Sequence, residues 1–272
     1  VICLFLKNLL IWINNLIFSM KIEIDDFFEP MPLKYPPTEG DYEKAEAYIQ
    51  IADAFFRATH SSIYIIDYYK KGFLYVSDNP LFLCGETPKQ ALRLGYEFYT
   101  KHVPSSDLSL LLQINDAGFK FYYNIPIPER LNYGISYDFH LVQKDGRLIL
   151  INHKLTPLAL DRQHNVWLAL CVVTHSSHDS PGNIIITHKD GWKKFEYNLN
   201  TKSWDELQRT ALTLQEKEIL ALSMQGFTMD EIAEKLDVAK VTIKFHRKNI
   251  FRKLKVNNIS EAISYAVIFN IF

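Results

Sequence analysis

The sequence predicts an α+β fold, with an N-terminal antiparallel sheet flanked by helices and a C-terminal all-α unit of four helices. Three observations support this prediction. β-rich runs separated by turn residues occur on both sides of a helical, proline-punctuated stretch over residues 78–114. From residue 212 to residue 272 the pattern is helical throughout, with capping boxes. The 272 residues fit two domains, at ~150 residues per domain.

Residues 1–40 are predicted to form an N-terminal extension, whose first nineteen residues read VICLFLKNLLIWINNLIFS. Met20 opens an acidic segment, so we interpret Met20 as the start, residues 1–19 as a start-site artefact, and the protein as cytoplasmic. Two alternatives stay open. The stretch is long enough for a membrane anchor, which needs ~20 apolar residues, or it packs on the body as an apolar helix. Its three asparagines weigh against an anchor, because unpaired amides are costly in lipid.

The sensor-like part begins with an amphipathic helix over Asp41–Thr59, where apolar residues follow helical spacing. The runs Ile63–Asp67 and Phe73–Ser77, joined by YYKKG, predict a hairpin. Three longer runs predict antiparallel strands: Ile135–Gln143, Leu148–Leu160 and Val166–His175. A five-stranded sheet with helices across one face is the economical arrangement of these elements.

This order of two strands, several short helices and three strands resembles the PAS sensor domain. IYIID and FLYVSDNPLFLCG are similar to its opening hairpin and helix, and YDFHLVQKDGR and LALDRQHNVWLAL are similar to its closing strands. The resemblance covers residues 60–177 and implies that residues 41–181 sense a signal or mediate dimerisation. Residues 182–211 are predicted to form a further hairpin and a linker, with Asp190-Gly191 at the turn.

A PAS-like sheet can hold a ligand against its helices, and aromatic side chains are candidates for its lining, with core packing as the alternative for each. The candidates are Phe82, Tyr96, Phe98, Tyr122, Tyr137, Phe139 and Trp167. Cys84 stands in L-F-L-C-G and not in the N-C-R-F-L run of flavin-photosensing relatives, which disfavours covalent flavin chemistry. His102, His140 and His153 are available as haem ligands, but nothing singles one out. No cofactor is therefore predicted, and an unidentified small-molecule signal stays open.

Motifs of enzymes and metal sites are absent from the sequence. It has no G-x-S-x-G, P-loop, G-x-G-x-x-G or H-E-x-x-H motif, so we predict that the protein is not an enzyme. Cys3, Cys84 and Cys171 have neither the spacing of metal ligands nor that of a disulfide framework, so no metal site is predicted.

The C-terminal segment predicts a helix-turn-helix. Capping boxes of the form T-x-x-E open the first two helices at Thr213 and Thr228, and Gly226 ends the first helix. A third helix is expected over Lys240–Leu254, after a three-residue connection, and a fourth over Ser260–Phe269. Two helices joined by such a short link, the second long and basic, are typical of DNA-binding proteins.

The predicted third helix has a basic face. Residues 240–255 include seven Lys or Arg residues and no Asp or Glu. At 3.6 residues per turn, Lys244, Lys248 and Arg252 lie away from an apolar stripe, and Val241 and Phe245 lie beside them. Basic side chains can donate hydrogen bonds to guanine, and apolar ones can contact the thymine methyl group. A solvated basic surface is the alternative interpretation.

The residues also resemble the LuxR/GerE-type DNA-binding domain. The matching motifs are L-T-x-x-E-x-E-I-L-x-L, G-F-T-x-x-E-I-A-x-x-L, T-I-K-x-H-x-x-N-I-x-x-K-L and E-A-I. The resemblance implies that the third helix enters the major groove of double-stranded DNA and that the fourth mediates homodimerisation. Ala239, Phe245 and Ile259 depart from the usual family pattern.

The resemblance also assigns individual residues to the DNA contact. It places Lys244, Phe245 and Lys248 at base-contacting positions, with Val241 close to the bases. Thr242, His246 and Lys253 would contact phosphate or brace the helix, and a packing role for His246 stays open. Lys240 and Arg252 complete the candidate DNA-binding set from the basic face.

These predictions favour a bacterial, sequence-specific transcriptional regulator that acts as a homodimer. Two alternatives remain: a regulator whose helix-turn-helix binds RNA polymerase or other transcription machinery, and a membrane-tethered sensor that uses residues 1–19. The net charge of −1 does not exclude DNA binding, because it combines two unlike parts. Residues 1–209 have 21 basic and 24 acidic side chains, whereas residues 210–272 have 9 basic and 7 acidic ones.

Overall fold

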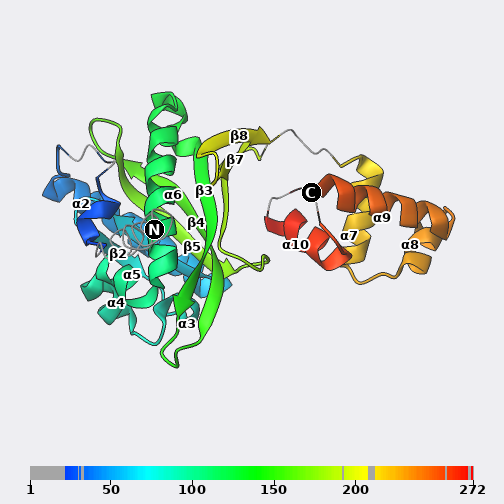
Figure 1. Ribbon diagram of the computed structural model, residues 1–272, viewed down its shortest axis with the longest axis horizontal. Helices are drawn as coiled ribbons and strands as arrows, with labels where there is room; N and C mark the ends of the chain where they lie inside the picture. The colour runs from blue at the N-terminus through cyan, green and yellow to red at the C-terminus, as the bar shows by residue number, and fades with distance from the viewer. Residues whose placement is uncertain are drawn as a thin grey trace, which may run out of the picture.

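The computed structural model describes residues 22–29, 31, 34–191, 193–207, 212–254, 256–268 and 271 (Figure 1). The apolar residues 1–19, with their three interpretations, lie outside this description. Within the described ranges no helix combines the length and apolarity that a membrane span requires.

The N-terminal body is built on one eight-stranded antiparallel sheet with the strand order β2-β1-β5-β4-β3-β6-β7-β8. The strands are β1 (Ser62–Asp67), β2 (Gly72–Val76), β3 (Tyr133–Val142), β4 (Leu148–Leu160), β5 (Val166–His175), β6 (Gly182–His188), β7 (Lys194–Asn198) and β8 (Ser203–Leu207). The predicted α+β class and the two-strand, helix, three-strand order are confirmed. β4 and β5 have the predicted bounds.

The prediction of five strands was wrong, because β6, β7 and β8 continue the same sheet beyond β3. The predicted hairpin is present as β6 and β7, and it is bonded into the sheet through the pairing of β6 with β3. β8 was not predicted, since its sequence SWDEL has no run of β-branched residues. It is the edge strand next to β7.

Helices cover both faces of the sheet, so the prediction of helices across one face was wrong, and the alternation of side chains along β1 separates the two layers. Tyr64 and Ile66 point into the main core with the helices of residues 80–123, whereas Ile65 contributes to a second cluster under α2 (Glu39–Thr59). The main-core helices are α3 (Pro80–Leu83), α4 (Pro88–Leu94), α5 (Glu97–His102) and α6 (Ser105–Tyr123). α6 continues nine residues beyond the predicted helical stretch, and a short 3₁₀ helix, η2 (Ile127–Asn132), leads from it to β3. A 3₁₀ turn, η1 (Ile24–Phe27), precedes α2.

The C-terminal unit has the four predicted helices. They are α7 (Leu214–Met224), α8 (Met229–Lys235), α9 (Lys240–Leu254) and α10 (Ile259–Ile268). Their shared core includes Ile219, Ile232, Ile243 and Ile250, which are fully buried. Gly226 has φ +89°, a left-handed conformation that glycine adopts without strain, and it ends α7 as the sequence predicted.

A hydrogen-bonded polar cluster lies inside the main core. The hydroxyl of Tyr64, a fully buried residue, lies 2.5 Å from the hydroxyl of Tyr99 and 2.6 Å from Nε2 of His153. Burial lowers the pKa of His153 to about 3, so the imidazole is neutral at physiological pH. The ring of His153 also packs against Tyr137, with centroids 4.9 Å apart. The cluster therefore connects β1, α5 and β4 and supports one ring of the pocket described below.

The variant Tyr64→Phe is expected to lower the free energy of unfolding by ~1–3 kcal/mol, because it leaves Tyr99 and His153 without a buried partner. Urea unfolding followed by circular dichroism measures the change. The matched control is Tyr122→Phe, whose buried hydroxyl makes no hydrogen bond within the described part of the chain. The control should change stability by less than about 0.5 kcal/mol. Equal losses in both variants would contradict the role of the Tyr64 hydroxyl.

Candidate functional site

The first helix of the C-terminal unit is fixed at its start by a capping box. The backbone N–H of Thr213 donates to the Glu216 carboxylate over 2.8 Å, and the Glu216 N–H donates to the Thr213 hydroxyl over 3.2 Å. The same carboxylate accepts a 2.6 Å hydrogen bond from Nζ of Lys253 in α9. Glu216 therefore orients α7 and also holds α9 against it.

The electrostatics of Glu216 agree with this double role. Burial raises the pKa of the Glu216 carboxyl, but the hydrogen bonds from Lys253 and from the Thr213 backbone lower it by more, so its pKa lies below the usual range. The side chain of Glu216 is 3% exposed and that of Lys253 is 26% exposed. Salt screens such a partly buried pair less than it screens a pair on the surface.

The connection from α8 to α9 has the compact geometry of a helix-turn-helix. The second capping box holds the start of α8, where the Thr228 N–H donates to Glu231 over 2.7 Å. After α8 the Val238 N–H donates to the Ala233 carbonyl over 3.0 Å, and α9 begins directly after Ala239. The alanine methyl group cannot cap the helix, and the N–H groups of Lys240 and Val241 donate to no described residue, so these two amides remain available to an anion such as phosphate.

The predicted division of α9 into two faces is confirmed. Ile243, Ile250 and Leu254 are buried in the core of the unit. Lys244 and Lys248 are exposed on the other side and form no ion pair with any described residue. The helix has 15 residues, a length of about 22 Å at 1.5 Å per residue.

Two large apolar side chains lie exposed beside these lysines. Val241 is 71% exposed and Phe245 is 61% exposed, and the Phe245 ring meets His246 edge-on with centroids 5.6 Å apart. Exposed apolar side chains on a basic helix suit the base edges and thymine methyl group of a DNA groove. We call Val241, Phe245, Lys244 and Lys248 together the α9 contact face.

The other predicted DNA-binding residues have different surroundings. Lys253 is held by Glu216, which corresponds to bracing, one of its two predicted roles. Lys240 forms an exposed 2.7 Å ion pair with Asp230 of α8, and Arg252 donates to Asn249 within its own helix. Thr242 and His246 are half-buried at the border of the α9 contact face.

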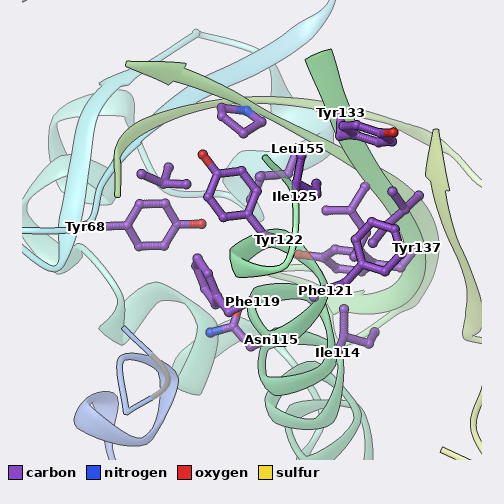
Figure 2. Close-up of a pocket in the computed structure, with 16 residues that line it drawn as sticks. Tyr68, Ile114, Asn115, Phe119, Phe121, Tyr122, Ile125, Tyr133, Tyr137 and Leu155 are labelled. Atoms are coloured by element: carbon purple, nitrogen blue, oxygen red, sulfur yellow. The ribbon is translucent and has the colours of Figure 1, made fainter. Parts of the chain in front are cut away.

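The N-terminal body contains a pocket between the C-terminal half of α6 and strands β3, β4 and β6 (Figure 2). It encloses about 560 Å³ of empty space, part of it open to solvent. The lining side chains come mainly from aromatic and branched aliphatic residues. They are Tyr68, Ile114, Asn115, Phe119, Phe121, Tyr122, Ile125, Tyr133, Ile135, Tyr137, Leu155, Pro157, Val166 and Ile186, with Gly118 and Gly134.

Of the aromatic residues that the sequence suggested as a ligand lining, Tyr122 and Tyr137 line this pocket. Phe82 and Phe98 stack on each other in the core, with centroids 4.5 Å apart, and Trp167 packs against Tyr42 of α2 on the opposite face of the sheet. Tyr96 and Phe139 are also core residues. The position of Phe121 was missed, because the sequence does not show which helical residues face a gap in the packing.

The chemistry of the pocket favours an uncharged ligand. No charged side chain belongs to its lining. The buried hydroxyl of Tyr122 makes no hydrogen bond to any described residue, so this polar group of the lining is available to orient a guest. The described residues contain no cluster of three or more His, Cys, Asp or Glu side chains that could hold a metal ion.

Comparison with known proteins gives a family match at the C-terminus. Residues 210–266 match the family model described as "Bacterial regulatory proteins, luxR family". The regulator MalT of Vibrio campbellii is 44% identical over 66 residues, and that of Yersinia pestis is 45% identical over 62 residues. These matches cover 24% and 22% of this chain but 7% of each relative, so the chain spans a small part of their length.

Solved structures that resemble this chain do so with low sequence identity and low TM-scores. The Vibrio cholerae VqmA dimer is 13% identical, with 85% of this chain and 88% of VqmA covered and a TM-score of 0.30. A PAS domain from a two-component sensor histidine kinase is 17% identical, with 48% of this chain and 99% of that chain covered and a TM-score of 0.32.

The variant Glu216→Gln is expected to lower the unfolding free energy of the C-terminal unit by ~1–3 kcal/mol, because Lys253 loses its buried anionic partner. The folded-state pKa of Glu216 is lowered, so the pair stabilises the fold above the unfolded pKa of ~4.3. This contribution disappears as the pH falls through the folded pKa.

Thermal unfolding at pH 7 and pH 3 measures this effect. The difference between the wild type and the variant should be present at neutral pH and shrink in acid. Glu234→Gln, at an exposed position of α8, is the control and should have little effect at either pH. A stability loss of the same size at both pH values would contradict the ion pair.

Proposed function

We propose that this chain, whose residues 210–266 belong to the luxR family of bacterial regulatory proteins, is a transcriptional regulator that binds double-stranded DNA through α9. The observation that carries the proposal is the α9 contact face. It combines exposed lysines that pair with no described residue and exposed apolar side chains, on a helix whose opposite side is anchored in a core. The DNA major groove, ~12 Å wide, accepts one such helix.

The proposed contacts divide the residues by role. Lys244, Phe245 and Lys248 contact base edges, with Val241 beside them. Thr242 and His246 at the border, together with the uncapped amides at the start of α9, contact phosphates. The exposed cations near the ends of the helix, Lys240 and Arg252, are within reach of the DNA backbone after release from Asp230 and Asn249. Lys253 acts indirectly, because it holds α9 in place.

The N-terminal body supplies the sensory part of the proposed function. A neutral, largely apolar small molecule binds in the pocket, with one polar group at the Tyr122 hydroxyl. Two copies of the chain place their α9 helices in successive major grooves, ~34 Å apart. The pocket then controls how well the two helices fit the DNA, since a ligand shifts a conformational equilibrium by its difference in affinity for the two states.

A second candidate function uses the same surface for a protein partner. The exposures of Val241 and Phe245, 71% and 61%, also suit the apolar centre of an interface with RNA polymerase or another part of the transcription machinery. Salt dependence separates the two candidates. DNA binding weakens steeply with salt because phosphate contacts release counterions, whereas an apolar protein interface does not show this steep loss.

Lys244→Ala and Lys248→Ala should each weaken specific DNA binding by ~1–3 kcal/mol without a loss of stability. Fluorescence anisotropy with a duplex selected from a random library measures the affinity between 50 and 200 mM salt, a range over which phosphate-binding proteins lose affinity about a thousandfold or more. The control is Lys89→Ala, which removes an exposed lysine of α4 in the N-terminal body. If both α9 variants bind as the wild type does, the groove assignment is wrong. If the wild type shows no salt-sensitive DNA binding, the protein-interface candidate is favoured.

The pocket should bind the neutral fluorophore N-phenylnaphthylamine and exclude its sulfonated analogue, anilinonaphthalene sulfonate. No cation lines the pocket to pair with a sulfonate, so the anion is expected to bind at least about tenfold more weakly. The gain in fluorescence on titration measures both affinities. Similar affinities for the two probes, or no binding of the neutral one, would contradict the assignment of a neutral ligand.

A further inference from the structure

A cluster of aromatic rings joins the wall of the pocket to the last strands of the sheet. The ring of Phe121, which lines the pocket, lies 4.8 Å from the ring of Phe195 in β7 and 5.2 Å from that of Trp204 in β8, centroid to centroid. Nε1 of Trp204 donates a 3.3 Å hydrogen bond to the carbonyl of Ala117 in α6. We call Phe121, Phe195 and Trp204 the aromatic junction.

β7 and β8 depend on this junction for their position. Among the residues that the structure describes, β7 pairs with β6 through Lys194, Phe195 and Glu196, and β8 has β7 as its neighbour in the sheet. Phe195 pairs in register with Ile186, a pocket-lining residue of β6. In the pocket wall, Phe121 of α6 therefore contacts both β7 and β8, and Ile186 of β6 pairs with β7. A shift of α6 displaces the ring against which β7 and β8 pack.

The same strands lead to the DNA-binding unit. β8 is the last strand before α7, and the chain reaches the Thr213 cap soon after Leu207. A second contact runs through β7, where adjacent side chains face opposite sides of the sheet. Phe195 meets α6, and Nζ of Lys194 lies 5.6 Å from the ring centroid of Tyr265 in α10. Both strands thus contact the pocket helix α6, and β7 also contacts the C-terminal unit.

We propose that the aromatic junction of Phe121, Phe195 and Trp204 transmits the state of the pocket to the DNA-binding unit. This inference rests on the proposed function, since it names the regulation of that DNA-binding site. A guest that displaces α6 relative to β3 moves Ala117 and Phe121, and these residues move β8 through Trp204. The position of β8 then sets where the C-terminal unit begins and how freely its α9 reaches DNA.

Gly118 offers a way to move the pocket wall without knowing the ligand. A Cβ atom at this position of α6 would lie 3.3 Å from Cδ1 of Ile135 in β3, so in Gly118→Ala the Ile135 side chain must give by a few tenths of an ångström, which changes the pocket wall between α6 and β3. Both residues line the pocket. The matched control is Gly40→Ala in α2, where an added Cβ meets nothing within 4 Å.

The test is a double-mutant cycle in the full chain, with the DNA dissociation constant as its readout. Gly118→Ala is expected to change this constant at least about fivefold, the lower end of typical allosteric coupling. In the background of Trp204→Leu the same substitution should change it by less than about twofold, because the junction is broken. Gly40→Ala should have no effect in either background.

Two further variants guard against trivial outcomes. Phe195→Leu breaks the junction at a second point and should also abolish the effect of Gly118→Ala, which keeps the test decisive if Trp204→Leu does not fold. Trp167→Leu removes a tryptophan on the opposite face of the sheet and should leave the effect intact. Circular dichroism confirms that each variant is folded.

The outcomes separate the inference from the function on which it rests. DNA binding by the wild type together with a silent Gly118→Ala, or an effect that survives both Trp204→Leu and Phe195→Leu, overturns the transmission route alone. Absence of salt-sensitive DNA binding in the wild type contradicts the proposed function itself.

Discussion

The alternation of side chains along β-strands organises the N-terminal body. All six residues of β1 are buried, because one face of the strand packs under α2 and the other under the helices of the main core. The same alternation in β7 directs Phe195 towards α6 and Lys194 towards α10. A sheet covered on both faces thus connects the helices of one layer to those of the other.

In the C-terminal unit a single carboxylate has a comparable role. The Glu216 carboxylate accepts hydrogen bonds from the Thr213 backbone and from Lys253 of α9. One buried group therefore positions both the start of α7 and the helix α9. The lysine that α9 uses for this contact lies on the side away from Lys244 and Lys248. Lys244 and Lys248 therefore remain exposed on one side of α9, whereas Lys253 on the other side fixes the orientation of the helix.

Local patterns in the sequence predicted local structure well. The bounds of β4, β5 and α9 agree with the predicted ranges, because hydrophobic periodicity and capping residues act over one element. Long-range relations were not predictable. Lys253 and Glu216 are 37 positions apart, and SWDEL becomes a strand only because β7 offers it an edge. The pocket depends on which side chains of α6 leave a gap against β3, and periodicity does not encode such a gap.

In the part of the chain that the structure describes, β8 forms an edge of the sheet, and this edge has a consequence for self-association. A strand with a neighbour on one side presents unpaired backbone groups to other chains, and such edges promote aggregation unless charged residues protect them. The middle of β8 presents Asp205 and Glu206, both exposed, to the solvent. A second copy approaching this edge would meet the same two negative charges, so sheet extension between chains is disfavoured at the strand that precedes the DNA-binding unit.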